Sequence, residues 1–257
     1  MLFQSMMFAP GTVPVLYNDS MSIQNKVTIV TGAGRGIGRA TAVRFARAGA
    51  RVVLFGRTRE ALEDALAQIR AEGGDALAVP GDVAREEDVQ ALFQRTLDVY
   101  GRVDILINCA GVVAVRPFAE MDAQTWDYVL NVNLRGTFLC CQHAFKLMAR
   151  QQGGVILNIS SLSGVKNVEK FPGLSAYNVS KAGVASLTEI LAVEGKPFNI
   201  RVAAVSPGAV DTEMLRQAAP HLKAGMTPAE MAEILFFMAD DTGRVLSGTN
   251  LEIFSNA

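Results

Sequence analysis

Apolar residues follow two different patterns along this chain. Short runs rich in Val, Ile and Leu recur at intervals, and the segments between them carry apolar residues every three or four positions. The first pattern is typical of strands buried on both faces, and the second is typical of amphipathic helices. The runs predict strands at residues 27–31, 51–56, 76–80, 104–108, 155–159, 200–206 and 248–254. The segments between them predict a helix after the first strand, helices at 58–72, 85–100, 123–150 and 176–194, and a helix that begins at Thr227-Pro228.

Strands and helices alternate throughout, and no second pattern interrupts them. This order predicts a three-layer α/β/α fold, in which helices cover both faces of a doubly wound parallel sheet of about seven strands. We expect one domain over residues 21–257, because no boundary is visible after Met21. Residues 1–20 contain no Lys or Arg and are interrupted by Pro10 and Pro14, which fits an N-terminal extension better than a signal peptide or a membrane span.

Composition and charge narrow the class of protein. Of the 257 residues, 50% are hydrophobic and 19% are charged. The net charge is −1, and the Lys, Arg, Asp and Glu residues are scattered along the chain. We therefore expect neither a nucleic acid nor a membrane as partner. The three cysteines have no disulfide or metal-ligand spacing, which fits a reduced protein of the cytoplasm. A small molecule is the expected partner.

The helix predicted at 176–194 carries the candidate acid–base chemistry. Tyr177 and Lys181 stand four residues apart, so they project from one face of this helix. A free phenol has a pKa of about 10, and proton transfer at neutral pH requires a shift of roughly 3 units, or about 4 kcal/mol. An ammonium ~4.5 Å away contributes about 3.5 kcal/mol at an effective dielectric of ~20. We expect Lys181 to supply most of the shift, although such a pair also occurs by chance as a half-buried ring and a solvated amine.

A glycine-rich turn follows the first predicted strand. Gly32, Gly36 and Gly38 lie between this strand and its helix, within a β–α–β unit. Glycines in this position let the backbone approach a diphosphate, and the helix N-terminus offers free N–H groups to the anion. The turn predicts a dinucleotide site, whereas a glycine cluster outside this context would be equally consistent with a structural turn.

The end of the second predicted strand indicates which dinucleotide is bound. A carboxylate here would hold the ribose 2′-hydroxyl of NAD, but the chain has Gly56 followed by Arg57. Arg57 and Arg35, the latter from the glycine turn, could pair with a 2′-phosphate. We therefore expect NADP(H) in preference to NAD(H), with NAD(H) as the alternative.

Polar or small residues also follow the carboxyl ends of later strands. Asp82 could accept a hydrogen bond from adenine or cap the next helix, and the sequence favours neither reading. The small residues of Cys109-Ala-Gly111 would let a flat ring lie against the backbone. Asn133 lies in an apolar helical stretch and needs partners if it is buried. Ser160 and Ser161 follow a strand at the edge where open parallel sheets place their ligands.

In this order and at these strand ends, the residues resemble the short-chain dehydrogenase/reductase family from Lys26 to Phe254. The matching motifs are Thr31-Gly32-xxx-Gly36-x-Gly38, Asp82-Val83, Asn108-x-Ala110-Gly111, Asn133, Ser161, Tyr177-xxx-Lys181 and Pro207-Gly208-xxx-Thr212. The resemblance implies a Rossmann-type fold and NAD(P)-dependent oxidation of an alcohol or reduction of a carbonyl.

The resemblance also implies a role for each residue. Tyr177 would give or take the hydroxyl proton, and Lys181 would lower its pKa and bind the nicotinamide ribose. Ser161 would hold the substrate oxygen, and Asn133 would fix a water that relays protons. The residues implied to bind the cofactor are Gly32, Arg35, Gly36, Ile37, Gly38, Arg57, Asp82, Val83, Asn108, Ala110, Gly111, Tyr177, Lys181, Pro207, Gly208 and Thr212.

The chain departs from the family pattern in three places. Cys109 stands where Asn is common. The loop between the serines and the tyrosine is longer than usual, which leaves Ser160 and Ser163 as alternatives to Ser161. The lid expected from Asp211 to Thr227 is short, and the chain lacks the usual aspartate-glycine ending. These differences weaken any transfer of substrate identity.

Two enzyme readings and one non-enzyme reading follow. The first is an NADP(H)-dependent oxidoreductase similar to 3-oxoacyl thioester reductases, and the second is a sugar, polyol or steroid-like alcohol dehydrogenase that uses NAD. The third is a non-catalytic dinucleotide sensor, whose signature would be the loss of a catalytic side chain. The resemblance further implies a homodimer or homotetramer, with Phe138, Leu139, His143 and Phe145 as candidate contacts.

Overall fold

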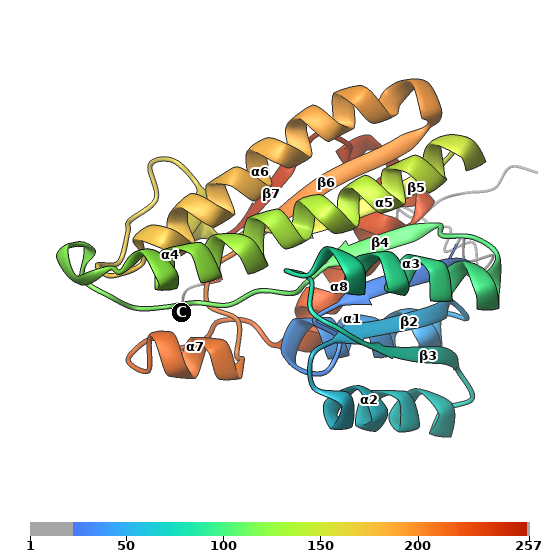
Figure 1. Cartoon of the computed structure of the whole chain (residues 1–257), viewed down its shortest axis with the longest axis horizontal. Coiled ribbons are helices and arrows are strands. Elements are labelled where there is room, and N and C mark those ends of the chain that lie inside the picture. Colours follow the sequence, from blue (N-terminus) through green and yellow to red (C-terminus); the bar gives the residue numbers. More distant parts are fainter. Residues whose placement is uncertain (1–22, 256–257) are drawn as a thin grey trace, which may run out of the picture.

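A parallel sheet forms the centre of the molecule. The computed structural model describes residues 23–255, and their strands pair in the order β3-β2-β1-β4-β5-β6-β7 (Figure 1). The prediction of a doubly wound parallel sheet is confirmed, whereas the extension expected at residues 1–20 lies outside the described residues. The strands are β1 Val27–Thr31, β2 Arg51–Gly56, β3 Asp75–Pro80, β4 Ile105–Asn108, β5 Gly154–Ile159, β6 Ile200–Pro207 and β7 Asn250–Ile253.

Helices cover both faces of this sheet. One face carries α1 Gly36–Arg47, α2 Arg59–Ala71 and α8 Pro228–Ala239. The other face carries α3 Glu86–Tyr100, α4 Ala123–Leu130, α5 Gly136–Gln151 and α6 Ser175–Gly195 (Figure 1). The short helix α7 Glu213–Ala218 lies away from the sheet, beyond its carboxyl edge.

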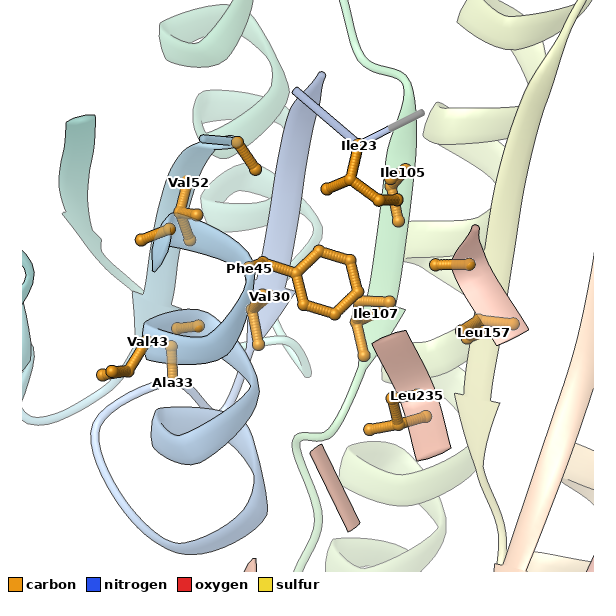
Figure 2. Packing of buried hydrophobic residues seen from close by; sticks show 14 of the residues in the cluster. Ile23, Val30, Ala33, Val43, Phe45, Val52, Ile105, Ile107, Leu157 and Leu235 are labelled. Atoms are coloured by element: carbon orange, nitrogen blue, oxygen red, sulfur yellow. The ribbon is translucent and has the colours of Figure 1, made fainter. Parts of the chain in front are cut away.

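Alternate residues of each strand supply the two apolar cores. Val30 of β1 joins the core beneath α1 and α8, while its neighbour Ile29 joins the core beneath α3 and α5, because successive strand side chains point to opposite faces. In Figure 2, the ring of Phe45 from α1 lies over the sheet between Val30 and Ile107. The apolar spacing that predicts this helix therefore reflects its packing on the sheet.

The direction of winding changes between β1 and β4, which are neighbours in the sheet. Thr31 at the end of β1 pairs with Asn108 at the end of β4. The Thr31 Oγ1 atom accepts hydrogen bonds from the backbone N–H groups of Cys109 and Ala110, both at 3.1 Å. Ligands of open α/β sheets bind at such a point, because the loops from the two strands diverge there and leave a crevice.

The helix expected at 123–150 differs from the prediction in one respect. A π-helical turn, Asn131–Arg135, separates α4 from α5. A π-helical turn contains more residues than an α-helical turn, so it shifts the helix face at this point, and such turns are frequent at functional sites. Asn133 lies in this turn and is fully buried.

None of the helices within residues 23–255 combines the length and apolar composition needed to cross a bilayer.

Candidate active site

A cleft of about 1230 Å³ opens at the carboxyl edge of the sheet. Its walls come from the glycine turn, the ends of the central strands, the first turns of α6 and the segment around α7. The predicted site residues that line it are Gly32, Arg35, Gly36, Ile37, Gly38, Arg57, Asp82, Val83, Ala110, Gly111, Ser161, Tyr177, Lys181, Pro207, Gly208 and Thr212. Asn108 and Asn133 do not line the cleft.

The glycine turn forms a cradle that larger residues could not form. A Cβ atom at Gly38 would lie 2.2 Å from the Gly32 carbonyl oxygen, so α1 can pack this closely on β1 only with glycine there. Gly32 has a φ of +67°, and a Cβ atom there would lie 2.9 Å from the Ala110 Cα. The cradle places the N-terminus of α1 at the cleft, and this arrangement fits the diphosphate of a dinucleotide.

Tyr177 and Lys181 lie on the same side of α6, as predicted. The Lys181 Nζ atom lies 5.7 Å from the centroid of the Tyr177 ring and donates a hydrogen bond of 2.7 Å to the Ile159 carbonyl oxygen. A Cβ atom at Gly111 would lie 3.6 Å from this Nζ atom, so the end of β4 approaches the ammonium closely. The lysine therefore reaches across the cleft floor between the ends of β4 and β5.

Burial changes the expected acid–base balance of this pair. Burial raises the pKa of Tyr177, and a hydrogen bond with Ser161 opposes the increase. Burial also lowers the pKa of Lys181 to about 8. Burial is the main cause of the shift in the tyrosine pKa, and the ammonium is directed to the Ile159 carbonyl oxygen, so the expected effect of Lys181 on the phenol stays a prediction.

The three candidate serines have different surroundings. Ser160 is 2% exposed and its hydroxyl donates to the Lys181 carbonyl oxygen at 2.8 Å, so it joins β5 to α6. The Ser161 Oγ atom accepts a hydrogen bond from the Ser163 N–H at 3.2 Å and faces the Tyr177 hydroxyl. This contact with the phenol favours Ser161 over its two neighbours as the residue that meets the substrate oxygen.

Both asparagines of the predicted site lie behind the cleft. The Asn133 side chain accepts from the Val112 N–H at 2.8 Å and donates to the Val112 carbonyl oxygen at 2.9 Å and to the Ser180 hydroxyl at 3.0 Å. The Asn108 side chain donates to Asn158 at 2.8 Å. The short side chain of Asn108 points into the interior and holds β4 against β5, and the expectation that this residue lines the cofactor stays a prediction.

Two arginines of the predicted site line the cleft. The Arg57 guanidinium donates to the Tyr128 hydroxyl at 3.1 Å, and Arg35 forms an ion pair with Glu213 of α7. Asp82 accepts the Ala84 N–H at 2.9 Å, so this side chain supports the turn into α3 while it lines the cleft. The carboxylate bonds an N–H that precedes α3, whose N-cap is Arg85, so Asp82 does not cap this helix, and its contact with adenine stays a prediction.

Some side chains around the site carry no strong signal in the sequence. The Ser180 hydroxyl accepts a hydrogen bond from the Asn133 side-chain amide. In the sequence, only its position next to Lys181 could have suggested this contact. Glu213 pairs with Arg35 across 178 positions of sequence, and no local pattern connects them. Thr31 could be recognised only as part of the glycine motif, although its hydroxyl orders the loop after β4.

The outer part of the cleft is mainly apolar. Leu162, Phe171 and Leu174 line it from the long loop before α6, and Met214 lines it from α7. The loop is held in place, because the Lys170 ammonium donates to the carbonyl oxygens of Leu162 and Val165 at its base.

Cys109 lies at the floor of the cleft beside Lys181. Burial raises the pKa of this thiol to about 12, although the nearby ammonium opposes the increase. The thiol is therefore protonated at neutral pH and is a poor nucleophile. Its small size suits a position where a flat ring would lie against the backbone.

Comparisons with known proteins give a consistent result. The sequence profile of the family described as short chain dehydrogenase matches residues 26–223. An uncharacterized oxidoreductase of Bacillus subtilis, YxjF, is 41% identical over 194 residues, which cover 76% of this chain and 74% of the relative. A 3-oxoacyl-[acyl-carrier-protein] reductase of Synechocystis is 37% identical over 225 residues, which cover 84% of this chain and 90% of the relative. The solved structure of a 7α-hydroxysteroid dehydrogenase, in complex with NADH and 7-oxo glycochenodeoxycholic acid, is 29% identical and superposes with a TM-score of 0.86 over 92% of this chain and 96% of that chain.

Proposed function

This chain belongs to the short-chain dehydrogenase/reductase family and is an NAD(P)-dependent oxidoreductase that acts on CH–OH groups, and we propose that it interconverts a secondary alcohol and a ketone with NADP(H) as its preferred cofactor. One observation carries the proposal: Ser161, Tyr177 and Lys181 line the same cleft as the glycine cradle. A phenol, a hydroxyl and an ammonium there lie within reach of a dinucleotide held by its diphosphate.

The chain's own residues handle the proton. Tyr177 gives a proton to the carbonyl oxygen during reduction and takes it from the hydroxyl during oxidation. Ser161 holds the same oxygen and stabilises the negative charge that develops on it. Lys181 holds the ribose next to the reacting ring, and Asn133 fixes a water that relays the proton to solvent. When bound, the dinucleotide supplies the hydride chemistry.

The charge at the adenosine end supports the preference for NADP(H). Arg35 and Arg57 line this end, and the end of β2 is Gly56, which offers no carboxylate to a ribose 2′-hydroxyl. A guanidinium fork matches the geometry of a phosphate, so two arginines favour a 2′-phosphate. Tighter binding of NADH than of NADPH in a fluorescence titration would contradict this assignment.

The apolar outer wall and the relatives support two substrate classes. The relative named as a 3-oxoacyl-[acyl-carrier-protein] reductase supports a 3-oxoacyl thioester as the substrate. The steroid dehydrogenase supports the second candidate, a cyclic alcohol of steroid-like shape with NAD, because it is similar over most of both chains. A sugar or polyol is the weaker alternative, since Phe171 and Leu174 offer its hydroxyl groups no hydrogen-bond partners.

Replacing the proposed proton donor tests the activity directly. We expect Tyr177→Phe to lower kcat by at least about 10²-fold, or roughly 2.7 kcal/mol, because the transition state loses its acid–base group. Binding of NADPH, followed by fluorescence, should change little because the ring is retained. Initial rates on thioester, cyclic ketone and sugar panels identify the substrate class in the same assay.

The sensor reading has its own outcome in this experiment. A wild-type protein that binds NADPH tightly and consumes none with any carbonyl panel would support a sensor and contradict the proposal.

We further propose that the protein works in the cytoplasm as a homodimer or homotetramer. The free thiols of all three cysteines support a reducing compartment.

A further inference from the structure

An ion pair joins the glycine turn to the lid. Arg35, the residue before Gly36 in the turn, pairs through its Nη1 atom with the Glu213 carboxylate, and Glu213 is the first residue of α7. The two segments also approach each other beside this pair, since a Cβ atom at Gly36 would lie 3.4 Å from the Thr212 methyl group. The ion pair therefore links the lid to the glycine turn.

The lid helix orients Glu213 for this contact. Gln217, one turn later, donates from its side-chain amide to the second carboxylate oxygen of Glu213 at 2.9 Å. Arg216 of the same helix pairs with Asp211 at 2.5 Å instead. Glu213 thus presents one oxygen to Arg35 while Gln217 holds the other.

The same guanidinium is needed elsewhere in the proposed function. We have assigned Arg35, with Arg57, to the 2′-phosphate of NADP. Arg57 donates to the Tyr128 hydroxyl, so a phosphate would not have to displace a carboxylate from this contact. Arg35 differs, because its Nη1 atom already donates to the Glu213 carboxylate, and a phosphate bound through the remaining N–H groups would lie beside that negative charge. Two anions that repel each other would therefore share one guanidinium.

We propose that Glu213 is a specificity-determining residue that weakens binding of the 2′-phosphate by holding Arg35, so that NADP(H) releases the lid from the glycine turn and NAD(H) leaves it fastened. This inference rests on the proposed use of Arg35 in cofactor binding. Linkage makes the effect reciprocal. The Arg35–Glu213 ion pair lowers the affinity for the 2′-phosphate, and a bound 2′-phosphate weakens the ion pair by the same factor. The pair is exposed, so we expect a coupling of up to about fivefold.

Two mononucleotides isolate the effect from catalysis. Adenosine 2′,5′-bisphosphate and 5′-AMP differ only in the 2′-phosphate, and calorimetry at one ionic strength gives the Kd of each. We expect Glu213→Gln to tighten binding of the bisphosphate about three- to fivefold and to leave 5′-AMP within twofold. The matched control is Glu63→Gln, because Glu63 pairs with Arg59 of α2 at 3.9 Å and neither residue lines the cleft. It removes the same charge and should change neither Kd by more than about twofold.

A double-mutant cycle separates this inference from the cofactor assignment. In an Arg35→Met background, Glu213→Gln should no longer tighten binding of the bisphosphate. The inference is overturned if Glu213→Gln leaves the bisphosphate unchanged, tightens both nucleotides equally, or acts as strongly without Arg35. If Arg35→Met itself fails to weaken the bisphosphate relative to 5′-AMP, the assignment of Arg35 to NADP fails instead.

Hydrogen exchange reports on the lid directly. The bisphosphate should speed amide exchange in residues 211–222 of the wild-type protein, whereas 5′-AMP should not. Glu213→Gln should show fast exchange without any nucleotide. Slower exchange in this segment with the bisphosphate than with 5′-AMP would contradict the release of the lid.

Discussion

Lys181 is a buried ammonium whose charge state depends on the fold. Its side chain is 5% exposed, and burial lowers its pKa from 10.5 to about 8. Between these two values the unfolded chain binds more protons than the native protein, so the stability of the native protein rises with pH in this window. Below about pH 8 both states carry the proton and the contribution is constant.

The variant Lys181→Met tests this linkage. We expect the free energy of unfolding of the wild type, relative to the variant, to rise by up to about 3 kcal/mol from pH 8 to pH 10, since one pKa unit corresponds to about 1.4 kcal/mol. Urea denaturation at several pH values measures the difference. Lys146→Met, a change at an exposed lysine of α5, should give a curve parallel to that of the wild type. Parallel curves for Lys181→Met would show that this lysine is not desolvated.

Ser161 lowers the pKa of the Tyr177 phenol, the proposed proton donor. Its hydrogen bond lowers the pKa of Tyr177 against the effect of burial. Removing it in Ser161→Ala should raise that pKa, so the pH at which alcohol oxidation reaches its full rate should move upward. Profiles of kcat/KM against pH measure the shift, which a purely steric role of the serine would not produce. Ser163→Ala should leave the profile in place, because the N–H group of Ser163 and not its hydroxyl contacts Ser161.

At the scale of elements, the loop before α6 is a preformed wall of the cleft. The Lys170 ammonium binds two carbonyl oxygens at its base, and the Arg116 N–H donates to the Gly173 carbonyl oxygen at 2.9 Å. Gly173 also has a φ of +83°, and a Cβ atom there would lie 3.0 Å from Val115. The loop is thereby fixed to the segment after β4, and together they shape the substrate end.

Loss of the Lys170 ammonium should therefore affect substrate binding more than chemistry. We expect Lys170→Met to raise KM for the best substrate about tenfold and to leave kcat within about threefold, because carbonyl groups without donors loosen the wall but not the Tyr177 helix. Steady-state kinetics separate the two constants. The exposed Lys166 of the same loop provides the matched control, Lys166→Met, with unchanged kinetics. An equal loss in kcat would place Lys170 in the catalytic step instead.

At the scale of the whole molecule, exposed apolar side chains on α5 and α6 form the surface that we propose for assembly. Phe138 is 41% exposed and Ile190 is 50% exposed, on helices that lie side by side (Figure 1). The other contacts suggested by the sequence are used within the subunit: Leu139 is buried, His143 stacks on Phe93, and Phe145 packs against Phe198. Phe138 therefore stays a predicted contact, as do His143 and Phe145, which are only partly buried.

A charge on this surface should prevent assembly. We expect the wild type to be a dimer or tetramer, and Phe138→Lys or Ile190→Lys to lower the molar mass measured by light scattering, because burying an unpaired ammonium is costly. Val99→Lys, at an exposed position of α3, should leave the mass unchanged. A monomeric wild type would contradict the proposal for the assembly.

The local signals in the sequence determined the elements and the positions of the main motifs. The apolar run Val27–Thr31 and the apolar spacing in α6 reflect which faces of the strand and the helix are buried. This periodicity can be recognised within a short stretch of sequence. The cradle of Gly32 and Gly38 and the pairing of Tyr177 with Lys181 on one helix face follow from the same short-range geometry.

Only the tertiary structure decided how distant groups share charge and space. It directed Lys181 to the Ile159 carbonyl oxygen, turned Asn108 away from the cleft and brought Glu213 to Arg35. Each of these outcomes depends on desolvation and on contacts between segments far apart in the chain, and neither quantity is encoded in local spacing. The sequence therefore identified the chemical groups, and the packing of the sheet and lid set their partners and acidity.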